Sequence, residues 1–175
     1  GNTTASSAIL AAMTGAKAEA IVGRGTGVND QQLKNKRLAV VRAIEVNKPD
    51  SQDPLDVLHK VGGLEIAGLA GLILGAAKHR VPVVIDGFIS TAAALIAGKL
   101  SPLAVKYMFA SHLSQEPGHR LMLERLGLAP VIHMDLRLGE GTGAVLCFPF
   151  FDAIIRIMRE MATFASAGIS SKQLS

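Results

Sequence analysis

The chain has 175 residues, of which 49% are hydrophobic, and a formal net charge of +4. This length fits one ordinary domain with a substantial core, and the abundance of Leu, Ile, Val and Ala excludes a disordered chain. Apolar stretches such as Leu64–Ala77 are shorter than the ~20 residues of a membrane span, so we expect no membrane association. The single cysteine, Cys147, permits no internal disulfide and favours the reducing cytoplasm.

The small positive charge favours anionic small molecules over nucleic acid. Lysine and arginine are scattered apart from Lys34, Lys36 and Arg37, and the chain has six Phe, one Tyr and no Trp. A single-strand binder needs aromatic platforms beside a basic groove, and no helix-turn-helix or zinc-finger pattern is present. We therefore expect a small phosphorylated ligand and no nucleic-acid partner.

The N-terminal part predicts helices separated by glycine-rich turns. Asn and Thr within Gly1–Thr4 are cap residues for a helix over Ala5–Met13, which Gly15 ends. Because the sequence opens inside such a junction, we expect residues upstream of it. A second glycine run, Gly23–Gly27, leads into an amphipathic helix over Gln31–Asn47.

Short strands and helices alternate over the rest of the chain. The predicted elements are helices over Leu55–Val61, Glu65–Lys78, Ser90–Gly98, Pro117–Leu126 and Thr142–Phe164, and strands over Val81–Ile85, Tyr107–Ala110 and Val131–Asp135. The helix over Glu65–Lys78 is so rich in Gly, Ala and Leu that we expect it to be buried nearly all round. In the last helix, Pro149 predicts a kink.

This alternation is typical of an α/β fold with a doubly wound, mainly parallel sheet, flanking helices and a long C-terminal helix. Three strands make a narrow sheet for such a fold, so we expect the chain to be part of a larger domain. That part extends over residues 1–164, and residues 165–175 are expected to form a frayed tail.

Polar residues follow each predicted strand. Asp86 and Gly87 follow the first, Ser114 comes after the second, and Leu138–Gly143 comes after the third. Because the carboxyl ends of parallel strands meet at one edge of a sheet, these residues could line a single crevice. Ordinary strand-to-helix turns favour the same residue types, so both interpretations stay open.

The segment Leu138–Gly143 carries the strongest signal. Its carboxylate, Glu140, is flanked by three glycines, each of which costs backbone entropy on folding. Close approach of the backbone to a ligand would justify that cost, with Glu140 reaching the ligand. The alternative is a solvated glutamate that stabilises the start of the next helix by ~0.3–1 kcal/mol.

Other chemistries find less support. Five scattered histidines and one cysteine lack metal-ligand spacing, so we expect no metal site. Ser111 or Ser114 beside His112 could indicate a hydrolase, but no nucleophile-elbow motif accompanies them. A dinucleotide-dependent oxidoreductase is disfavoured because no complete glycine fingerprint follows a clear strand.

Seven motifs together match one known family. They are Gly-Asn-Thr-Thr at 1–4, Gly-Arg-Gly-Thr-Gly at 23–27, Leu-Lys-Asn-Lys at 33–36, Lys-Val-Gly-Gly at 60–63, Asp-Gly-Phe at 86–88, Ser-His-Leu-Ser at 111–114 and Leu-Gly-Glu-Gly-Thr-Gly at 138–143. From Gly1 to about Ser170 the chain closely resembles the nicotinate-nucleotide–dimethylbenzimidazole phosphoribosyltransferases of cobalamin biosynthesis. Complete members are about twice as long, so the chain resembles a C-terminal half.

The resemblance implies a reaction and a base. Phosphoribose passes from nicotinate mononucleotide to 5,6-dimethylbenzimidazole, giving α-ribazole 5'-phosphate and nicotinate. Glu140 corresponds to the family's general base, and no metal or redox cofactor is implied. The family also has a second carboxylate shortly upstream of the position of Gly1, and its N-terminal half builds much of the azole pocket.

The resemblance also assigns binding residues and partners. Gly1, Gly25 and Lys36 correspond to the phosphate-binding positions. The nucleotide crevice is expected to include Asp86, Gly87 and Ser114, with Leu138 at the edge of the azole pocket. A cytoplasmic homodimer is implied, for which the apolar C-terminal helix could supply the contact, although core packing would explain its residues equally well. The alternative function is a non-catalytic half that binds a phosphorylated nucleotide.

Overall fold

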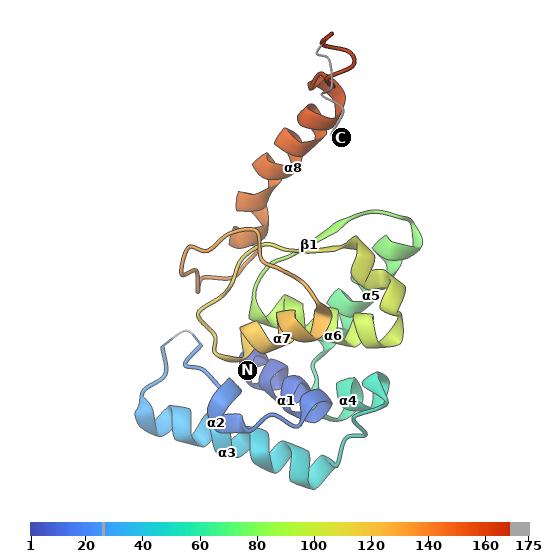
Figure 1. Ribbon diagram of the computed structural model, residues 1–175. Helices are drawn as coiled ribbons and strands as arrows, with labels where there is room; N and C mark the ends of the chain where they lie inside the picture. Colours follow the sequence, from blue (N-terminus) through green and yellow to red (C-terminus); the bar gives the residue numbers. More distant parts are fainter. Residues whose placement is uncertain (26, 169–175) are drawn as a thin grey trace, which may run out of the picture.

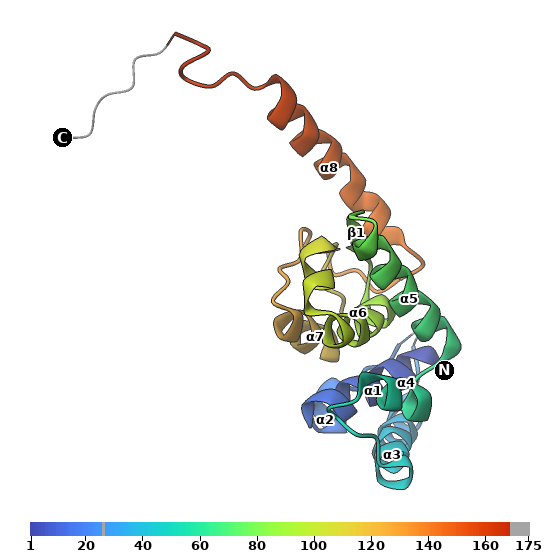
Figure 2. The ribbon, with the colours of Figure 1, turned by 90° about the vertical axis from the view of Figure 1, so that its right-hand side faces the viewer.

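The computed structural model describes residues 1–25 and 27–168. Its elements are α1 (Asn2–Thr14), α2 (Ala18–Ile21), α3 (Asp30–Asn47), α4 (Pro54–Val61), α5 (Leu64–Lys78), β1 (Val83–Ile85), α6 (Phe88–Leu100), the 3-10 helix η1 (Pro102–Tyr107), β2 (Met108–Ala110), α7 (Gly118–Leu126) and α8 (Thr142–Glu160). Helices α1 to α4 gather on one side, α5 to α7 and the strands lie beside them, and α8 projects away (Figure 1, Figure 2). The fold is α/β with a small parallel sheet.

Local signals set several helix ends. The predicted start of the first helix is wrong, because Gly1 is the N-cap of α1 and the next three residues lie inside the helix. Helix α1 ends at Gly15, which takes the left-handed conformation (φ 73°) that glycine adopts without steric cost. Helix α3 begins with a capping box, in which the Asn29 side chain accepts from the Gln32 amide and the Gln32 side chain accepts from the Asn29 amide. Helix α7 ends at Gly127 in the same left-handed conformation (φ 67°).

The core is built around α6, which packs against α1, α5 and α7. Its inward residues are small, and Ala92, Ala93, Ala94 and Ala97 are fully buried. Small side chains let neighbouring helices approach closely, and a Cβ atom added at Gly98 would lie only 3.0 Å from the Leu126 side chain. The chain passes from the end of β1 directly into α6, so the packing of α6 fixes the position of that strand end.

The sheet is narrower than the sequence predicts. Strands β1 and β2 pair in parallel, with Ile85 opposite Ala110. The predicted third strand over Val131–Asp135 is wrong, because within the described residues it contributes a single parallel bridge between His112 and Ile132. Asp135 has a positive φ of 50°, so the chain has already left the extended conformation there. The described sheet comprises two strands and this bridge.

Helix α5 also differs from its prediction. It buries only Ile66, Ala70 and Ile73, and Leu64 is 92% exposed. The expectation of burial nearly all round is wrong because α5 packs through one face, against α6 and η1. The glycines of α5 are Gly68, Gly71 and Gly75. A Cβ atom added at any of them would meet no described atom within 4 Å.

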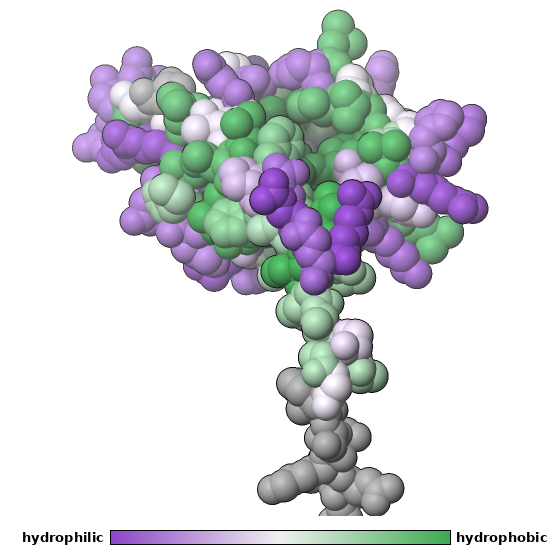
Figure 3. All heavy atoms as spheres, turned by 90° about the horizontal axis from the view of Figure 1, so that it is seen from above, coloured by the Kyte–Doolittle hydropathy of each residue, from purple (hydrophilic) through white to green (hydrophobic). Residues whose placement is uncertain are grey.

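Helix α8 begins as predicted and ends at Glu160, four residues before the predicted end, with Pro149 inside it. Only Gly143 and Cys147 of this helix are buried. Apolar side chains spread across the face from which α8 leaves (Figure 3). Of the expected tail, residues 165–168 form a turn and 169–175 lie outside the described residues. No described helix combines the length and hydropathy needed to cross a membrane.

Candidate functional site at the carboxyl ends of the strands

The two strands end side by side, as the sequence predicts. Asp86 and Gly87 follow β1, and Ser111 follows β2. The Ser111 hydroxyl donates to the Asp86 carbonyl oxygen at 2.9 Å, which joins the two strand ends directly. Gly87 caps α6, and a Cβ atom there would lie 3.6 Å from the His112 ring. The first two groups of predicted residues therefore meet at one edge of the sheet.

Asp86 connects this edge to the glutamate loop, which we define as Leu138–Gly143. Its Oδ2 accepts from the Gly141 amide and its Oδ1 accepts from the Ala144 amide, both at 3.1 Å. These amides lie at the start of α8, where the helix dipole also favours a carboxylate. Asp86, which the resemblance assigned to the crevice lining, thus fixes the position of the loop.

Glu140 lies in the middle of the glutamate loop. Its side chain is exposed, and no described group forms a hydrogen bond or ion pair with it. Gly139, Glu140 and Gly141 have φ angles of 81°, 57° and 80°, so three successive residues are left-handed. The glycines accept this conformation easily, whereas Glu140 carries ~1–2 kcal/mol of strain. Leu138 is 70% exposed, so the described residues do not enclose an azole pocket around it.

Two buried histidines lie behind the strand ends, with ring centroids 6.1 Å apart. The His119 Nδ1 accepts from the Ser114 amide at 2.8 Å, and its Nε2 lies 2.9 Å from the Thr91 hydroxyl. That hydroxyl donates to the Gly87 carbonyl oxygen, so Nε2 carries the ring proton and donates to Thr91. Neutral His119 therefore ties the predicted residue Ser114 to the predicted residue Gly87.

Burial keeps both rings neutral. It lowers the pKa of His119 to about 4, with a further lowering from His112 that Asp86 partly opposes. Burial also lowers the pKa of His112, and the negative charge of Asp86 partly opposes this shift. The Asp86 Oδ1 lies 4.0 Å from the His112 Nδ1. A Cβ atom at Gly143 would clash with the same nitrogen, so only glycine lets α8 begin against this ring. The described residues contain no cluster of three metal-ligating side chains.

The predicted phosphate residues gather at a second place, which we call the cradle: the start of α1, Gly23, Gly25 and Lys36. The Lys36 ammonium donates to the Thr3 hydroxyl at 3.0 Å and to the Gly23 carbonyl at 2.9 Å. A Cβ atom on Gly25 would lie 3.6 Å from the same ammonium, and Gly1 is the N-cap of α1, two residues before Thr3. The structure thus brings Gly1, Gly25 and Lys36 to one region.

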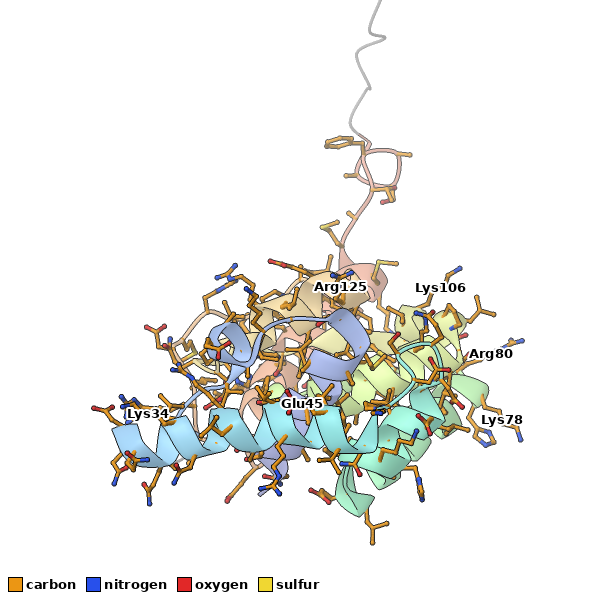
Figure 4. The ribbon with its side chains drawn as sticks, turned by 90° about the horizontal axis from the view of Figure 1, so that it is seen from below. Lys34, Glu45, Lys78, Arg80, Lys106 and Arg125 are labelled. Atoms are coloured by element: carbon orange, nitrogen blue, oxygen red, sulfur yellow. The ribbon has the colours of Figure 1, made fainter. Side chains whose placement is uncertain are left out.

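The Lys36 ammonium is the donor in the cradle that could reach an anion. Burial lowers the pKa of Lys36, and the nearby Glu116 carboxylate partly opposes that shift. Lys36 has three donors, of which Thr3 and Gly23 occupy two among the described residues. Lys34, by contrast, lies exposed on the outer surface of α3 (Figure 4).

Sequence reasoning missed Glu116. Its Oε1 accepts from the Gly25 amide at 2.8 Å, so this carboxylate lies within the cradle. Glu116 directly precedes Pro117 and α7, where acidic residues commonly serve as helix-terminal charges. No local pattern distinguishes this role from a ligand-site role, and the contact with Gly25 spans 91 positions.

Comparisons with known proteins agree with this geometry. A family model described as Phosphoribosyltransferase matches residues 1–169. A nicotinate-nucleotide–dimethylbenzimidazole phosphoribosyltransferase of Desulforamulus reducens is 61% identical over 97% of this chain and 48% of its own length. The protein of the same name from Dehalococcoides mccartyi is 57% identical over 99% of this chain and 49% of its own length.

A solved structure is equally similar in fold. The crystal structure of CobT from Thermus thermophilus superposes with a TM-score of 0.91 at 50% identity, covering 98% of this chain and 51% of that one. The chain spans about half the length of the relatives that it matches. Since the family model matches nearly all of its residues, the chain belongs to this phosphoribosyltransferase family.

Proposed function

We propose that the protein transfers phosphoribose from nicotinate mononucleotide to 5,6-dimethylbenzimidazole. The observation that carries this proposal is the meeting of Gly1, Gly25 and Lys36 in one cradle, in a chain whose strand ends also hold the glutamate loop. The name of a relative that is 61% identical supports the choice of substrates. As part of the proposal, residues 1–164 form the C-terminal part of a phosphoribosyltransferase domain.

The proposed chemistry needs one base. The lone pair of one azole nitrogen attacks the anomeric carbon while the bond from that carbon to the nicotinate nitrogen breaks. Nicotinate departs readily because its ring nitrogen is positively charged in the nucleotide and becomes neutral on leaving. Glu140 takes the proton from the other azole nitrogen, which prevents a cationic product. A positioned base of this kind contributes about 10²–10⁴-fold.

The remaining residues hold the substrate and the base. Lys36 and the Gly25 amide bind the phosphate of the nucleotide, and Gly1 adds an amide at the start of α1. Asp86 fixes the loop that carries Glu140. Ser114 and Gly87 line the crevice, and the neutral His119 holds both of their backbones.

A second candidate function is phosphorylated-nucleotide binding without catalysis. The exposure of Glu140 and Leu138 favours it, because these residues supply no enclosed pocket for the azole. The first candidate predicts turnover and the second does not, whereas both predict that the nucleotide binds.

We also propose that the protein is a cytoplasmic homodimer. The apolar side chains of α8 support the dimer, since Phe148, Ile154 and Met158 are 51%, 54% and 81% exposed. Core packing within the described residues does not cover them. A sedimentation measurement on the natively expressed protein tests the dimer, and a monomer at micromolar concentration would contradict it.

Turnover of the natively expressed protein tests the proposed reaction. We expect formation of α-ribazole 5'-phosphate, and we expect Glu140→Gln to lower kcat by about 10²–10⁴-fold while nicotinate mononucleotide still binds. The matched control is Glu160→Gln, which removes the same charge from an exposed position at the end of α8. Nucleotide binding without turnover in the unaltered protein would favour the second candidate.

A further inference from the structure

Glu116 places a negative charge where the proposed function needs a phosphate. Its Oε1 accepts from the Gly25 amide at 2.8 Å, and its charge acts on Lys36. Both partners are the groups assigned to phosphate binding. A phosphate and a carboxylate cannot share one amide donor, and two anions side by side repel each other.

The second oxygen of this carboxylate is buried without a partner. Oε2 of Glu116 has no hydrogen bond among the described residues. A Cβ atom on Gly23 would clash with that oxygen, so the carboxylate occupies the place that any other side chain at position 23 would take. A buried carboxylate oxygen that lacks a donor costs free energy, which makes this placement costly to keep.

An alternative place for Glu116 lies next to the cradle. Glu116 also lines a cavity of about 230 Å³ together with Ser114, Arg120 and His133. Pro117 already has helical dihedral angles (φ −55°, ψ −38°), so Arg120 lies about one helical turn beyond Glu116. Side chains at that spacing on a helix reach each other.

We propose that the Glu116 carboxylate occupies the phosphate cradle in the unliganded protein and leaves it when the substrate phosphate binds. The inference rests on the proposed function, because it takes Gly25 and Lys36 as the phosphate partners. The incoming phosphate takes the Gly25 amide and the neighbourhood of Lys36, and Glu116 turns into the cavity that Arg120 lines. Glu116 is thus a determinant of phosphate affinity, and the displaced carboxylate favours ligands that carry a full phosphate over weaker anions.

The test compares phosphate binding in the natively expressed protein with binding in Glu116→Gln, measured by calorimetry at pH 7. The probes are inorganic phosphate, nicotinate mononucleotide and the nucleoside that lacks the phosphate. We expect Glu116→Gln to lower the Kd for both phosphate probes by about tenfold and to leave the nucleoside unchanged, because only the phosphate competes with the carboxylate. The control is Glu124→Gln, an equal charge change on an exposed position of α7, which should leave all constants unchanged.

A second measurement does not depend on the variant. In the unaltered protein, saturating inorganic phosphate should shift the carboxyl ¹³C resonance of Glu116 and the amide resonance of Gly25. An unchanged or higher Kd in Glu116→Gln, or a Glu116 resonance that phosphate leaves in place, overturns the inference. If neither protein binds any phosphate probe, the proposed function fails as well, so the two failures are distinguishable.

Discussion

The cradle and the glutamate loop differ in how much of their surroundings this chain supplies. In the cradle, the Lys36 ammonium, the Thr3 hydroxyl and the Gly25 amide all have partners from distant segments. In the glutamate loop, Asp86 holds the backbone while the Glu140 side chain stays exposed. The described residues therefore supply the proposed phosphate partners, whereas they do not enclose a pocket for the proposed azole.

The difference follows from the chemistry that we propose for each region. A phosphate is recognised by backbone amides and one ammonium, which a loop and two helix segments can position. A proton transfer from an apolar heterocycle needs a pocket that excludes water, and such a pocket requires apolar walls on several sides. Leu138, with 70% of its surface exposed, provides one such wall in this chain.

The larger of the two effects that compare the loop with the cradle tests the anchor of the glutamate loop. Asp86→Ala removes two charge-assisted hydrogen bonds, to Gly141 and Ala144, so we expect kcat to fall about 100-fold, with a smaller change in KM. Hydrogen exchange of the Gly141 amide should accelerate in the variant. Glu45→Ala, which removes an exposed carboxylate from α3, is the control. An unchanged kcat would show that the loop holds its position without Asp86.

The free energy of unfolding, measured as a function of pH, tests the buried histidines behind the strand ends. The pKa of His119 is lowered to about 4 from an ordinary value of 6.5, so the folded state resists protonation that the unfolded chain accepts. This stability is fully present above pH 6.5, is lost as the pH falls to about 4, and amounts to about 3 kcal/mol. The lowered pKa of His112 acts in the same direction.

Urea unfolding between pH 7.5 and pH 4 measures this loss. His119→Gln should flatten the dependence, whereas His79→Gln, which replaces an exposed imidazole, should leave it intact. Protonation would also take the Nδ1 acceptor from the Ser114 amide. A free energy of unfolding that stays level from pH 6.5 to pH 4.5 in the unaltered protein would contradict the assignment of a neutral His119.

The smallest expected effect tests the cradle alone. Lys36→Met keeps the aliphatic stem and removes the charge, so the Kd for nicotinate mononucleotide should rise about tenfold. The nucleoside without phosphate should bind as before. Lys34→Met is the matched control, since Lys34 is exposed on the same helix (Figure 4). Equal losses for nucleotide and nucleoside would assign Lys36 a structural role.

Several features could be predicted because they depend on local chemistry. Gly15 and Gly127 end their helices, and Asn29 begins one, since caps and left-handed glycines act within one turn. The convergence of Asp86 and Ser111 followed from the rule that parallel strands end at one edge. The motifs that carry the family resemblance were likewise present in the sequence itself.

Other features needed the tertiary structure. The segment over Val131–Asp135 has strand-forming residues, yet it makes one bridge because extended pairing depends on a neighbour in register. Helix α5 has the composition of a buried helix, but how many of its faces are covered depends on what packs against it. The composition of a segment indicates whether its side chains favour burial or strand formation, but it does not determine which other segment packs against it.

By itself the sequence determined several helix ends, the approximate places of the two paired strands and the family, because caps, β-branched runs and spaced motifs depend on neighbouring residues. Only the tertiary structure decided that Glu116 lies against Gly25, 91 positions away, and that Asp86 holds the loop of Glu140. It also decided that His119 is neutral, since burial and its two hydrogen bonds set that state. Contacts between distant segments arise from the packing of the whole chain, and no local pattern encodes them.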